Sequence, residues 1–342
     1  MDATAAIIGY GGMGSRHARA LKALGVSLAA VCDTREEARE AARADYADVR
    51  TFDNVRELAE AVAGNVDIIC VVTNTPERAG ILRELLAAGP KRVLTEKPFT
   101  TNVADAHSLA RAYEDAGVML TVNTFRHFCD NHLRLRELLR EGSLGELRYL
   151  SIQSASAGLG NMGSVFFDVM NFYIESRPVA IMGNIDKTGT PSPRGSRFRD
   201  PGGFGVVSYE NGARGFIDTS EDTGVPYTFH FVTTYGRIFV DELSSEWRIA
   251  SRSEADRARP LTYYLSPLVD QPFELTHGYD PVEMTSFTMR EMMADSPAAY
   301  NAQAAVTVME MIMAMHVSGA DSCAPVELPL APEHHHIDIP FA

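Results

Sequence analysis

The stretch Ala5-Ala6-Ile7-Ile8-Gly9-Tyr10-Gly11-Gly12-Met13-Gly14 decides the fold of the N-terminal part of this chain. Its four apolar residues are typical of a short buried strand, and a helical pattern begins near Met13. Of the three glycines in the Gly-x-Gly-x-x-Gly pattern, Gly9 permits a tight turn, Gly11 lets the backbone approach a pyrophosphate, and Gly14 lets the helix pack closely on the strand. The pyrophosphate would rest on free N–H groups at the helix start. The stretch therefore predicts a dinucleotide-binding turn.

The first 122 residues alternate between short apolar runs and helical patterns, as in a parallel sheet covered on both faces. The pattern from 77 to 88 has a helical period, because its leucines and isoleucine recur on one stripe. Right-handed crossovers make a doubly wound topology the expected one. We expect residues 1–122 to form a Rossmann dinucleotide-binding domain. Its expected strands are 5–9, 28–32, 67–72, 91–95 and 118–122.

The pattern changes after residue 122, where longer runs rich in Val, Ile, Phe and Tyr are joined by turn signals such as Asn211-Gly212. We expect residues 123–342 to form an α+β domain with an open-faced, largely antiparallel sheet that binds the substrate. An apolar sheet face needs a cover, so a homodimer or homotetramer packed through this sheet is expected. The expected strands are 145–155, 178–186, 204–219, 227–241 and 246–250, and the expected helices are 131–141, 281–294 and 300–317.

The composition narrows the class of protein. A length of 342 residues suits two domains, and a formal net charge of −14 argues against nucleic acid or an anionic membrane as partner. No apolar stretch is long enough to span a membrane, and no basic region precedes the first apolar run, so a cytoplasmic location is expected. The four cysteines form no Cys-x-x-Cys pair and are interpreted as reduced thiols. The run His334-His335-His336 is interpreted as a solvated tail, and no metal site is expected.

Asp33 is the candidate for the ribose of a dinucleotide. It ends the second expected strand, 19 residues after Gly14, which is the spacing of a carboxylate that binds the adenosine ribose hydroxyls. A carboxylate there repels a 2′-phosphate and favours NAD. Arg16 and Arg35 could instead hold that phosphate, so NADP stays open. A structural alternative is that Asp33 caps the following helix.

Lys97, in the tripeptide Glu96-Lys97-Pro98, lies at the carboxyl end of the fifth expected strand, where ligands bind in sheets of this kind. The bond before Pro98 is a candidate for a cis peptide that turns the amine toward the crevice. We predict that Lys97 takes or returns a hydroxyl proton. The structural alternative is an ordinary surface lysine at a strand end.

These motifs together resemble the Gfo/Idh/MocA family of NAD(P)-dependent oxidoreductases along nearly the whole chain. The matching pieces are the glycine turn, the loop Thr73-Asn74-Thr75-Pro76, Glu96-Lys97-Pro98 and the segment Val122-Asn123-Thr124-Phe125-Arg126. The resemblance implies hydride transfer between NAD (or NADP) and a carbohydrate or cyclitol alcohol or ketone, with Lys97 positioning the reacting oxygen. The residues expected to hold the nucleotide are Gly9, Tyr10, Gly11, Gly12, Met13, Gly14, Asp33, Thr34, Arg35, Thr73, Asn74, Thr75, Pro76, Glu96, Lys97 and Asn123.

The chain departs from the family at a second motif, Asp-x-Gly-x-His-x-x-Asp, whose histidine is the acid/base. The best alignment runs from Asn161 to Asp168 and puts Val165 at the histidine position. Valine cannot exchange a proton. Three replacements are open: Asp168 on the same helix face as Val165, Tyr173, which becomes adjacent to the histidine position if the motif is shifted, or Lys97 acting alone or with His127. We rank Lys97 first and Asp168 second, so the expected catalytic residues are Lys97, Asp168 and Tyr173.

The substrate side of the site is expected to carry positive charge. Arginines are concentrated in the loop from Pro191 to Gly203, which could grip an anionic or nucleotide-linked sugar, although a solvated loop is an equally plain interpretation. Two further functions stay open, namely a redox-neutral sugar-modifying enzyme with tightly bound NAD and a non-catalytic NAD(P)-binding regulatory protein. The residues expected to face the substrate are Lys97, Arg126, His127, Asn161, Val165, Asp168, Arg197 and Arg199.

Overall fold

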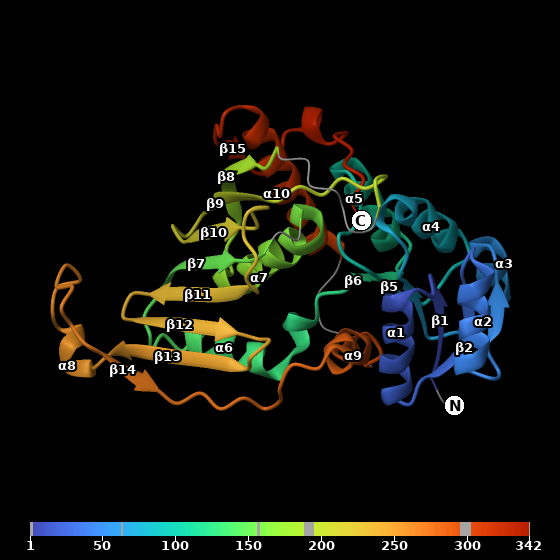
Figure 1. The fold of residues 1–342 in the computed structure, drawn as a ribbon, viewed down its shortest axis with the longest axis horizontal. Coiled ribbons are helices and arrows are strands. Elements are labelled where there is room, and N and C mark those ends of the chain that lie inside the picture. The colour runs from blue at the N-terminus through green and yellow to red at the C-terminus, as the bar shows by residue number, and fades with distance from the viewer. Residues whose placement is uncertain (1–2, 63, 156–157, 188–194, 295–301, 342) are drawn as a thin grey trace.

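The computed structural model describes residues 3–62, 64–155, 158–187, 195–294 and 302–341, which build two sheets side by side (Figure 1). The first sheet is parallel and six-stranded, with the order β3-β2-β1-β4-β5-β6. Its strands are β1 (Thr4–Ile8), β2 (Ser27–Cys32), β3 (Arg50–Phe52), β4 (Ile68–Val71), β5 (Arg92–Thr95) and β6 (Met119–Val122). The connecting helices are α1 (Gly12–Ala23), α2 (Glu36–Asp45), α3 (Val55–Val62), α4 (Thr75–Ala87) and α5 (Val103–Asp115). This order is that of a Rossmann domain, with a switch point between β1 and β4.

The second sheet has nine strands in the order β14-β13-β12-β11-β7-β10-β9-β8-β15 and is antiparallel except for the pairing of β10 with β7. Its strands are β7 (Leu147–Gln153), β8 (Pro178–Ile185), β9 (Gly203–Tyr209), β10 (Arg214–Asp218), β11 (Thr228–Thr233), β12 (Gly236–Asp241), β13 (Glu246–Arg252), β14 (Leu268–Gln271) and β15 (Val326–Glu327). The remaining helices are η1 (Phe125–Phe128), α6 (Asp130–Arg140), η2 (Gly158–Gly163), α7 (Ser164–Ile174), α8 (Glu254–Arg257), α9 (Pro281–Met292), α10 (Ala302–Ala320) and η3 (Pro332–His334). The predicted fold class is confirmed.

Two late helices join the halves of the molecule. Helix α10 packs on α5 and on β8, and most of its residues are buried, as expected for a predominantly apolar helix. Helix α9 returns to the N-terminal sheet and packs on α1, so that Met289 and Met292 share a core with Ile7 and Leu21. The Rossmann sheet therefore has one of its covering elements from the far end of the chain (Figure 1).

The predicted strands match the observed ones, with two kinds of difference. Each of the long runs 204–219 and 227–241 is two strands, divided at the predicted turn signals. Sequence analysis missed β3, β14 and β15, which have three, four and two residues, too few to show a period. Among the described residues, no helix combines the length and apolar character needed to cross a bilayer.

The glycine turn has the close packing that its sequence predicts. A Cβ on Gly14 would lie 2.0 Å from the carbonyl oxygen of Gly9, and Gly9 itself has φ +93°. We expect Gly14→Ala to destabilise the fold by about 1–3 kcal/mol, the usual cost of forcing extra atoms into a packed site, and to weaken NADH binding. Thermal unfolding and fluorescence titration with NADH measure the two effects.

The matched control for this prediction is Gly80→Ala, in the exposed part of α4. A Cβ on Gly80 meets nothing within 4 Å, so alanine there should stabilise the helix by about 0.5–1 kcal/mol and leave NADH binding unchanged. Equal stability of the Gly14→Ala variant and the unmodified protein would contradict the packing argument.

Candidate functional site

The turn between β1 and α1 offers an open backbone to a ligand. Gly11 is the N-cap of α1 and provides no side-chain cap for the first helical N–H groups. Gly11 and Gly12 are exposed, and a Cβ on Gly12 would meet nothing within 4 Å. Met13 follows in the first turn and is half-buried. An anion could therefore bind the free N–H groups at this helix start.

Asp33 lies beside this turn at the end of β2. One carboxylate oxygen accepts hydrogen bonds from the Tyr10 N–H at 2.8 Å and from Arg35, and the other accepts from the Arg35 N–H at 3.0 Å. Burial by itself would raise the pKa of Asp33, but these bonds outweigh it and lower the pKa, so the carboxylate stays ionised. The capping alternative is not what the structure shows, because Arg35 is the N-cap of α2. Thr34 between them is exposed.

Tyr10 and Arg35 both contact the Asp33 carboxylate. The Tyr10 ring is buried and its hydroxyl donates to Asp45 at 2.9 Å, so Tyr10 offers the site only its backbone. The Arg35 side chain is 61% exposed and passes 3.8 Å from the position of a Cβ on Gly11. Asp33 and an exposed guanidinium therefore lie together where the adenosine end of a dinucleotide would bind.

The loop from Thr73 to Pro76 connects β4 to α4 at the same edge of the sheet. Asn74 is the N-cap of α4 without a side-chain cap bond, and Pro76 occupies its first turn. The buried hydroxyls of Thr73 and Thr75 find no hydrogen-bond partner in the described part of the chain. Arg78 of α4 is buried and bonds the carbonyls of Thr73 (2.6 Å) and Pro98. This loop is thus fixed to the Lys97-Pro98 turn.

Glu96 is a buried carboxylate just after β5. Its Oε1 contacts His17 Nε2 at 2.7 Å and accepts a hydrogen bond from the Asn123 amide at 2.9 Å. Burial would raise the pKa of this carboxyl, but the contacts with His17 and Asn123 prevail and lower it to about 2. The Asn123 amide oxygen in turn accepts from Thr288 of α9 at 3.0 Å. Elements β5, β6, α1 and α9 are therefore held together at this point.

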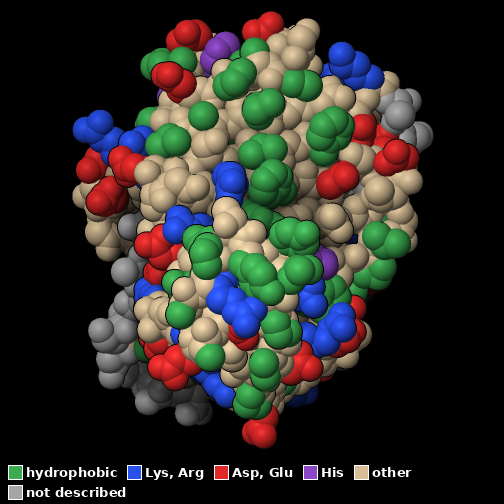
Figure 2. Space-filling view, turned by 90° about the vertical axis from the view of Figure 1, so that its left-hand side faces the viewer, with side chains coloured by type: hydrophobic (Ala, Val, Ile, Leu, Met, Phe, Trp, Pro, Cys, Tyr) green, Lys and Arg blue, Asp and Glu red, His purple; other side chains and the backbone are tan. Residues whose placement is uncertain are grey.

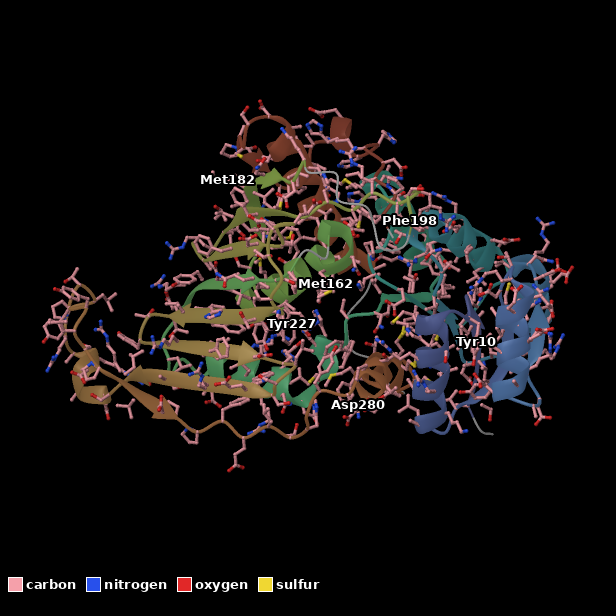
Figure 3. All side chains as sticks on the ribbon, viewed as in Figure 1. Tyr10, Met162, Met182, Phe198, Tyr227 and Asp280 are labelled. Carbon is pink, nitrogen blue, oxygen red and sulfur yellow. The ribbon has the colours of Figure 1, made fainter. Side chains whose placement is uncertain are left out.

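Lys97 lies across from the second domain and contacts it directly. Its Nζ donates to the backbone carbonyl of Asn161 at 2.9 Å and to the side-chain oxygen of Asn161 at 2.5 Å. The Lys97–Pro98 bond is cis, as expected. Asn161 belongs to the one-turn helix η2, whose Gly160 and Asn161 N–H groups donate to the Asp200 carboxylate at 2.7 and 2.8 Å. The amine is thus placed at a defined point between the two sheets, and Met162, next to Asn161, lies on the side facing the Rossmann domain (Figure 3).

A histidine and a carboxylate meet at α7. His127 Nε2 lies 3.1 and 3.0 Å from the two oxygens of Asp168, which is buried. Asp168 is three residues after Val165 in α7, on the same helix face, and Val165 is partly buried against the core. The structure therefore pairs two of the residues that the sequence offered as separate replacements for the missing histidine.

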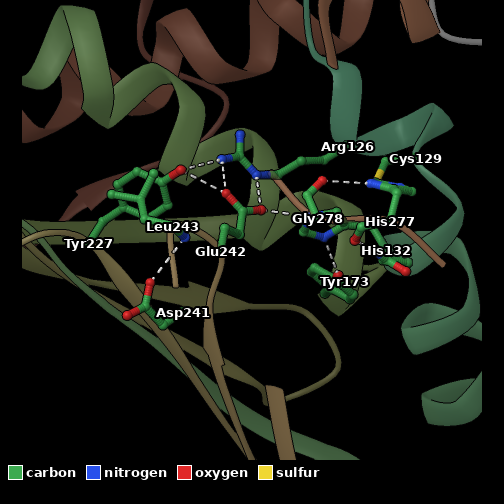
Figure 4. A network of polar contacts seen from close by, with 11 residues as sticks. Arg126, Cys129, His132, Tyr173, Tyr227, Asp241, Glu242, Leu243, His277 and Gly278 are labelled. Atoms are coloured by element: carbon green, nitrogen blue, oxygen red, sulfur yellow. Dashed lines mark hydrogen bonds and ion pairs between the residues drawn. The ribbon is translucent and has the colours of Figure 1, made fainter. Parts of the chain in front are cut away.

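Arg126 has a different surrounding from the one expected for a substrate residue. It is buried, and its guanidinium donates to both oxygens of Glu242 at 2.8 and 2.5 Å, while Tyr227 donates to Glu242 at 2.8 Å (Figure 4). The attraction between Arg126 and Glu242 overcomes burial and holds the pKa of the carboxyl far below its usual range. This correction has a simple cause, because a guanidinium with two bonds to a buried carboxylate has its binding capacity used within the protein.

Tyr173 belongs to the same buried network. Its hydroxyl is 2.6 Å from His132 Nδ1, and His132 Nε2 is 2.6 Å from Glu242 Oε1. Burial lowers the pKa of His132, which fits a neutral ring that accepts from Tyr173 and donates to Glu242. Burial likewise raises the pKa of Tyr173 well above its usual value. The expectation of a catalytic Tyr173 is corrected, because this phenol is buried and stays protonated.

The arginine loop is only partly described, since Arg194 lies outside the described residues. Arg197 is exposed and donates to Glu77 of α4 at 3.0 Å, which links the second domain to the first. The Arg199 side chain is exposed, and the backbone N–H of Arg199 donates to the Pro340 carbonyl. The charge of Arg197 is thus opposed by Glu77, which weakens the case for this loop as an anion grip.

Taken together, these features fit a dinucleotide. The open glycine turn and two uncapped helix starts suit the phosphates, Asp33 suits a ribose, and the hydroxyls of Thr73 and Thr75, which have no partner among the described residues, lie along the same edge.

The oxidoreductase family with an NAD-binding Rossmann fold, GFO_IDH_MocA, matches residues 3–124. The N-terminal domain is therefore the NAD-binding Rossmann domain of the Gfo/Idh/MocA oxidoreductases.

Relatives and solved structures extend the likeness to the second domain. Myo-inositol 2-dehydrogenase of Thermotoga maritima is 24% identical over 273 residues, 75% of this chain and 81% of that protein. Inositol 2-dehydrogenase of Rhizobium meliloti is 25% identical over 190 residues, about half of each chain (51% and 56%). Levoglucosan dehydrogenase, solved with NADH and levoglucosan, has 15% identity and a TM-score of 0.82, covering 96% of this chain and 100% of that one. This last likeness shows a shared two-domain fold.

Proposed function

We propose that this Gfo/Idh/MocA protein is an NAD-dependent dehydrogenase that moves a hydride between NAD and a CH–OH carbon of a cyclitol or sugar-like polyol. The observation that carries the proposal is the Lys97 amine held by Asn161 between the sheets, next to the buried Glu96 anchor. The inositol dehydrogenases among the relatives support this substrate class. The Asp33 carboxylate beside the glycine turn supports NAD over NADP.

The residues of the chain divide the work between them. NAD, when bound, supplies the hydride acceptor. Lys97 binds and polarises the substrate oxygen, and Asn161 orients the amine through two hydrogen bonds. Glu96 and Asn123 support the nicotinamide end of the site, as a rigid frame costs no reorganisation during the reaction.

We further propose that the His127–Asp168 pair carries the proton that the family's histidine would carry. An imidazole is a common general acid or base in enzymes, and the buried Asp168 carboxylate, 3.0 Å from His127 Nε2, orients the ring. Val165 cannot exchange a proton. His127 lies in η1, shortly after Asn123, which contacts Glu96, and Asp168 lies in α7, which directly follows η2 with Asn161, the partner of Lys97.

We expect His127→Gln to lower kcat/KM for the polyol by about 100- to 10,000-fold, the range for removal of a general acid or base. The pH dependence of kcat should lose its acidic limb, because glutamine does not titrate. The matched control is Tyr173→Phe, which removes a buried hydroxyl and should leave the shape of the pH profile unchanged. An unaltered profile in His127→Gln would contradict the proposed proton carrier.

Two broader features remain proposals. We propose a homodimer or homotetramer formed through the open sheet face, where the exposed side chains of Met182 and Phe204 lie. Figure 2 looks at the side of the molecule bearing the second sheet and shows hydrophobic side chains gathered along its middle. We also propose a cytoplasmic location and a small-molecule substrate without nucleic-acid or membrane partners, in keeping with the net charge of −14.

The valine at position 165 favours one alternative, a regulatory protein that binds NAD(H) without turnover. Titration with NADH and NADPH, followed by a screen of inositols and aldoses with NAD⁺ at 340 nm, separates the possibilities. Turnover with a polyol supports the dehydrogenase. Tight NADH binding without turnover on any polyol would favour the regulatory protein, and product formation without net NADH would favour a redox-neutral enzyme.

A further inference from the structure

The C-terminal histidine run is not a solvated tail, because His335 packs against two elements that are distant in sequence. His107 of α5 and Glu310 of α10 are joined by a contact of 2.9 Å between Nε2 and Oε1. The ring of His335, just after η3, stacks on that of His107 with centroids 5.2 Å apart and planes 19° from parallel. One nitrogen or oxygen from each of the three side chains lies within 4.8 Å of the others.

We propose that His107, Glu310 and His335 form a site for a divalent transition-metal ion, with zinc as the expected occupant. Two imidazoles and a carboxylate are a donor set that zinc binds, with ligands at about 2.0–2.2 Å and thus roughly 3.4 Å from one another in a tetrahedron. The contact of 2.9 Å already brings two ligand atoms close. Because the His107 side chain is 40% exposed, its ring has room to adjust and the ion has a path from solvent.

The protonation of His335 fits this role. Its Nε2 lies 2.8 Å from the carbonyl oxygen of Leu330 and can only donate there. In the neutral ring the lone pair is then on Nδ1, which leaves that nitrogen as the ligand atom. A ring N–H bonded to a backbone carbonyl is the usual outer support of a metal-binding histidine.

Glu310 supplies the strongest energetic reason. Its side chain is only 9% exposed, in the middle of a helix whose neighbouring residues Met309, Met311 and Ile312 are fully buried. Within the described residues, the Glu310 carboxylate takes part in one hydrogen bond, the one with His107. A buried charge with so little compensation is costly, whereas a divalent cation would compensate it directly.

The proposed ion would fasten the C-terminal segment beside the catalytic crevice. The His335 carbonyl accepts from the Ala104 N–H in the first turn of α5, and Ile339 N–H donates to Thr101. Six residues after His335, the buried Phe341 ring lies against Gly160, where a Cβ would come within 2.2 Å of it. Gly160 precedes Asn161, which holds Lys97. The site therefore links α5, α10 and the support of the Lys97 amine.

The test uses the full-length protein, stripped with a chelator and titrated with Zn²⁺. We expect about one tightly bound zinc per chain by elemental analysis, a rise in the unfolding temperature with Zn²⁺, and a visible spectrum of low-coordinate Co²⁺ when cobalt replaces zinc. His107→Gln and His335→Gln should each weaken binding by more than about 10- to 100-fold, the loss seen even when an outer-shell partner is removed. These readouts are independent of polyol turnover.

The neighbouring histidines provide the matched control. His334→Gln and His336→Gln alter the same run outside the cluster and should keep the stoichiometry and the temperature shift. The proposal is overturned if the stripped protein takes up no zinc, or if binding is lost in these controls and kept in His107→Gln. Glu310→Gln adds a third ligand test, and His107→Gln decides the question if burial makes that variant unstable.

Discussion

Replacement of Lys97 by methionine should lower kcat/KM for the polyol by about 100- to 10,000-fold, because the substrate oxygen then loses the amine that we propose binds and polarises it. Methionine keeps the length and packing of the side chain but cannot donate to Asn161 or to a substrate oxygen. The loss should fall mainly on kcat, since the amine acts on charge that develops as the hydride moves. Steady-state kinetics with NAD⁺ and the best polyol measure it.

Binding of NADH is the necessary control for Lys97→Met. In the proposed site the phosphates and ribose bind to the glycine turn and Asp33, which are separate from Lys97, so the dissociation constant for NADH should change by less than about threefold. Asn161→Ala removes one of the two acceptors of the amine and should have a smaller effect on kcat than Lys97→Met. Full activity of Lys97→Met would contradict the proposed role of Lys97, because another group would then bind the substrate oxygen and transfer its proton.

Replacement of Glu242 by alanine should be the most damaging single change to stability, at about 3–5 kcal/mol, because it leaves the buried Arg126 guanidinium uncompensated. The Glu242 side chain accepts from Arg126, Tyr227 and His132 (Figure 4), so three buried donors lose their acceptor together. Denaturant unfolding followed by circular dichroism measures the loss.

The pH dependence provides a second readout for Glu242. Its pKa in the folded protein lies below that of the unfolded chain, so its contribution to stability is present above the unfolded pKa and is lost as the pH falls below it. The alanine variant should therefore lose less stability on acidification than the unmodified protein. The exposed pair Arg177–Glu210 is the matched control, and Glu210→Ala should cost less than about 1 kcal/mol. Comparable losses in both variants would contradict the buried-pair argument.

The fold could be predicted from the sequence because its signals are local. Each signal can be recognised within about ten residues, as in the apolar runs around Ile7 and Cys70 and in the glycine turn. The structure confirms the two sheets. Helix α9 was found as a helix, but its place on α1 was not predicted, since nothing in 281–294 indicates which surface it covers. Packing between segments almost 270 residues apart has no local signature.

The candidate site divides in the same way. The positions of Asp33, Glu96 and Lys97 follow from strand ends and motif spacing. The residues that support the site do not, namely His17 bonded to Glu96, Arg78 bonded to Pro98 and Thr288 bonded to Asn123. His17 lies three residues after Gly14 on α1, and a polar residue on the sheet-facing side of that helix was the one signal that could have revealed it. Arg126 is the converse case. Its place in a family motif predicts a substrate contact, whereas its guanidinium is buried and paired with Glu242.

The return of α9 to α1 limits how far this enzyme can be treated as two modules. A fragment ending at residue 124 would leave the helix surface around Leu21 without Met289 and Met292, and Asn123 without Thr288. During synthesis the N-terminal domain must therefore wait for the last quarter of the polypeptide before its contacts with α9 are complete. If recombination exchanges the second domain between relatives, α9 and α1 have to be exchanged together as a matched pair. The evolution of substrate choice is therefore linked to that of the cofactor domain.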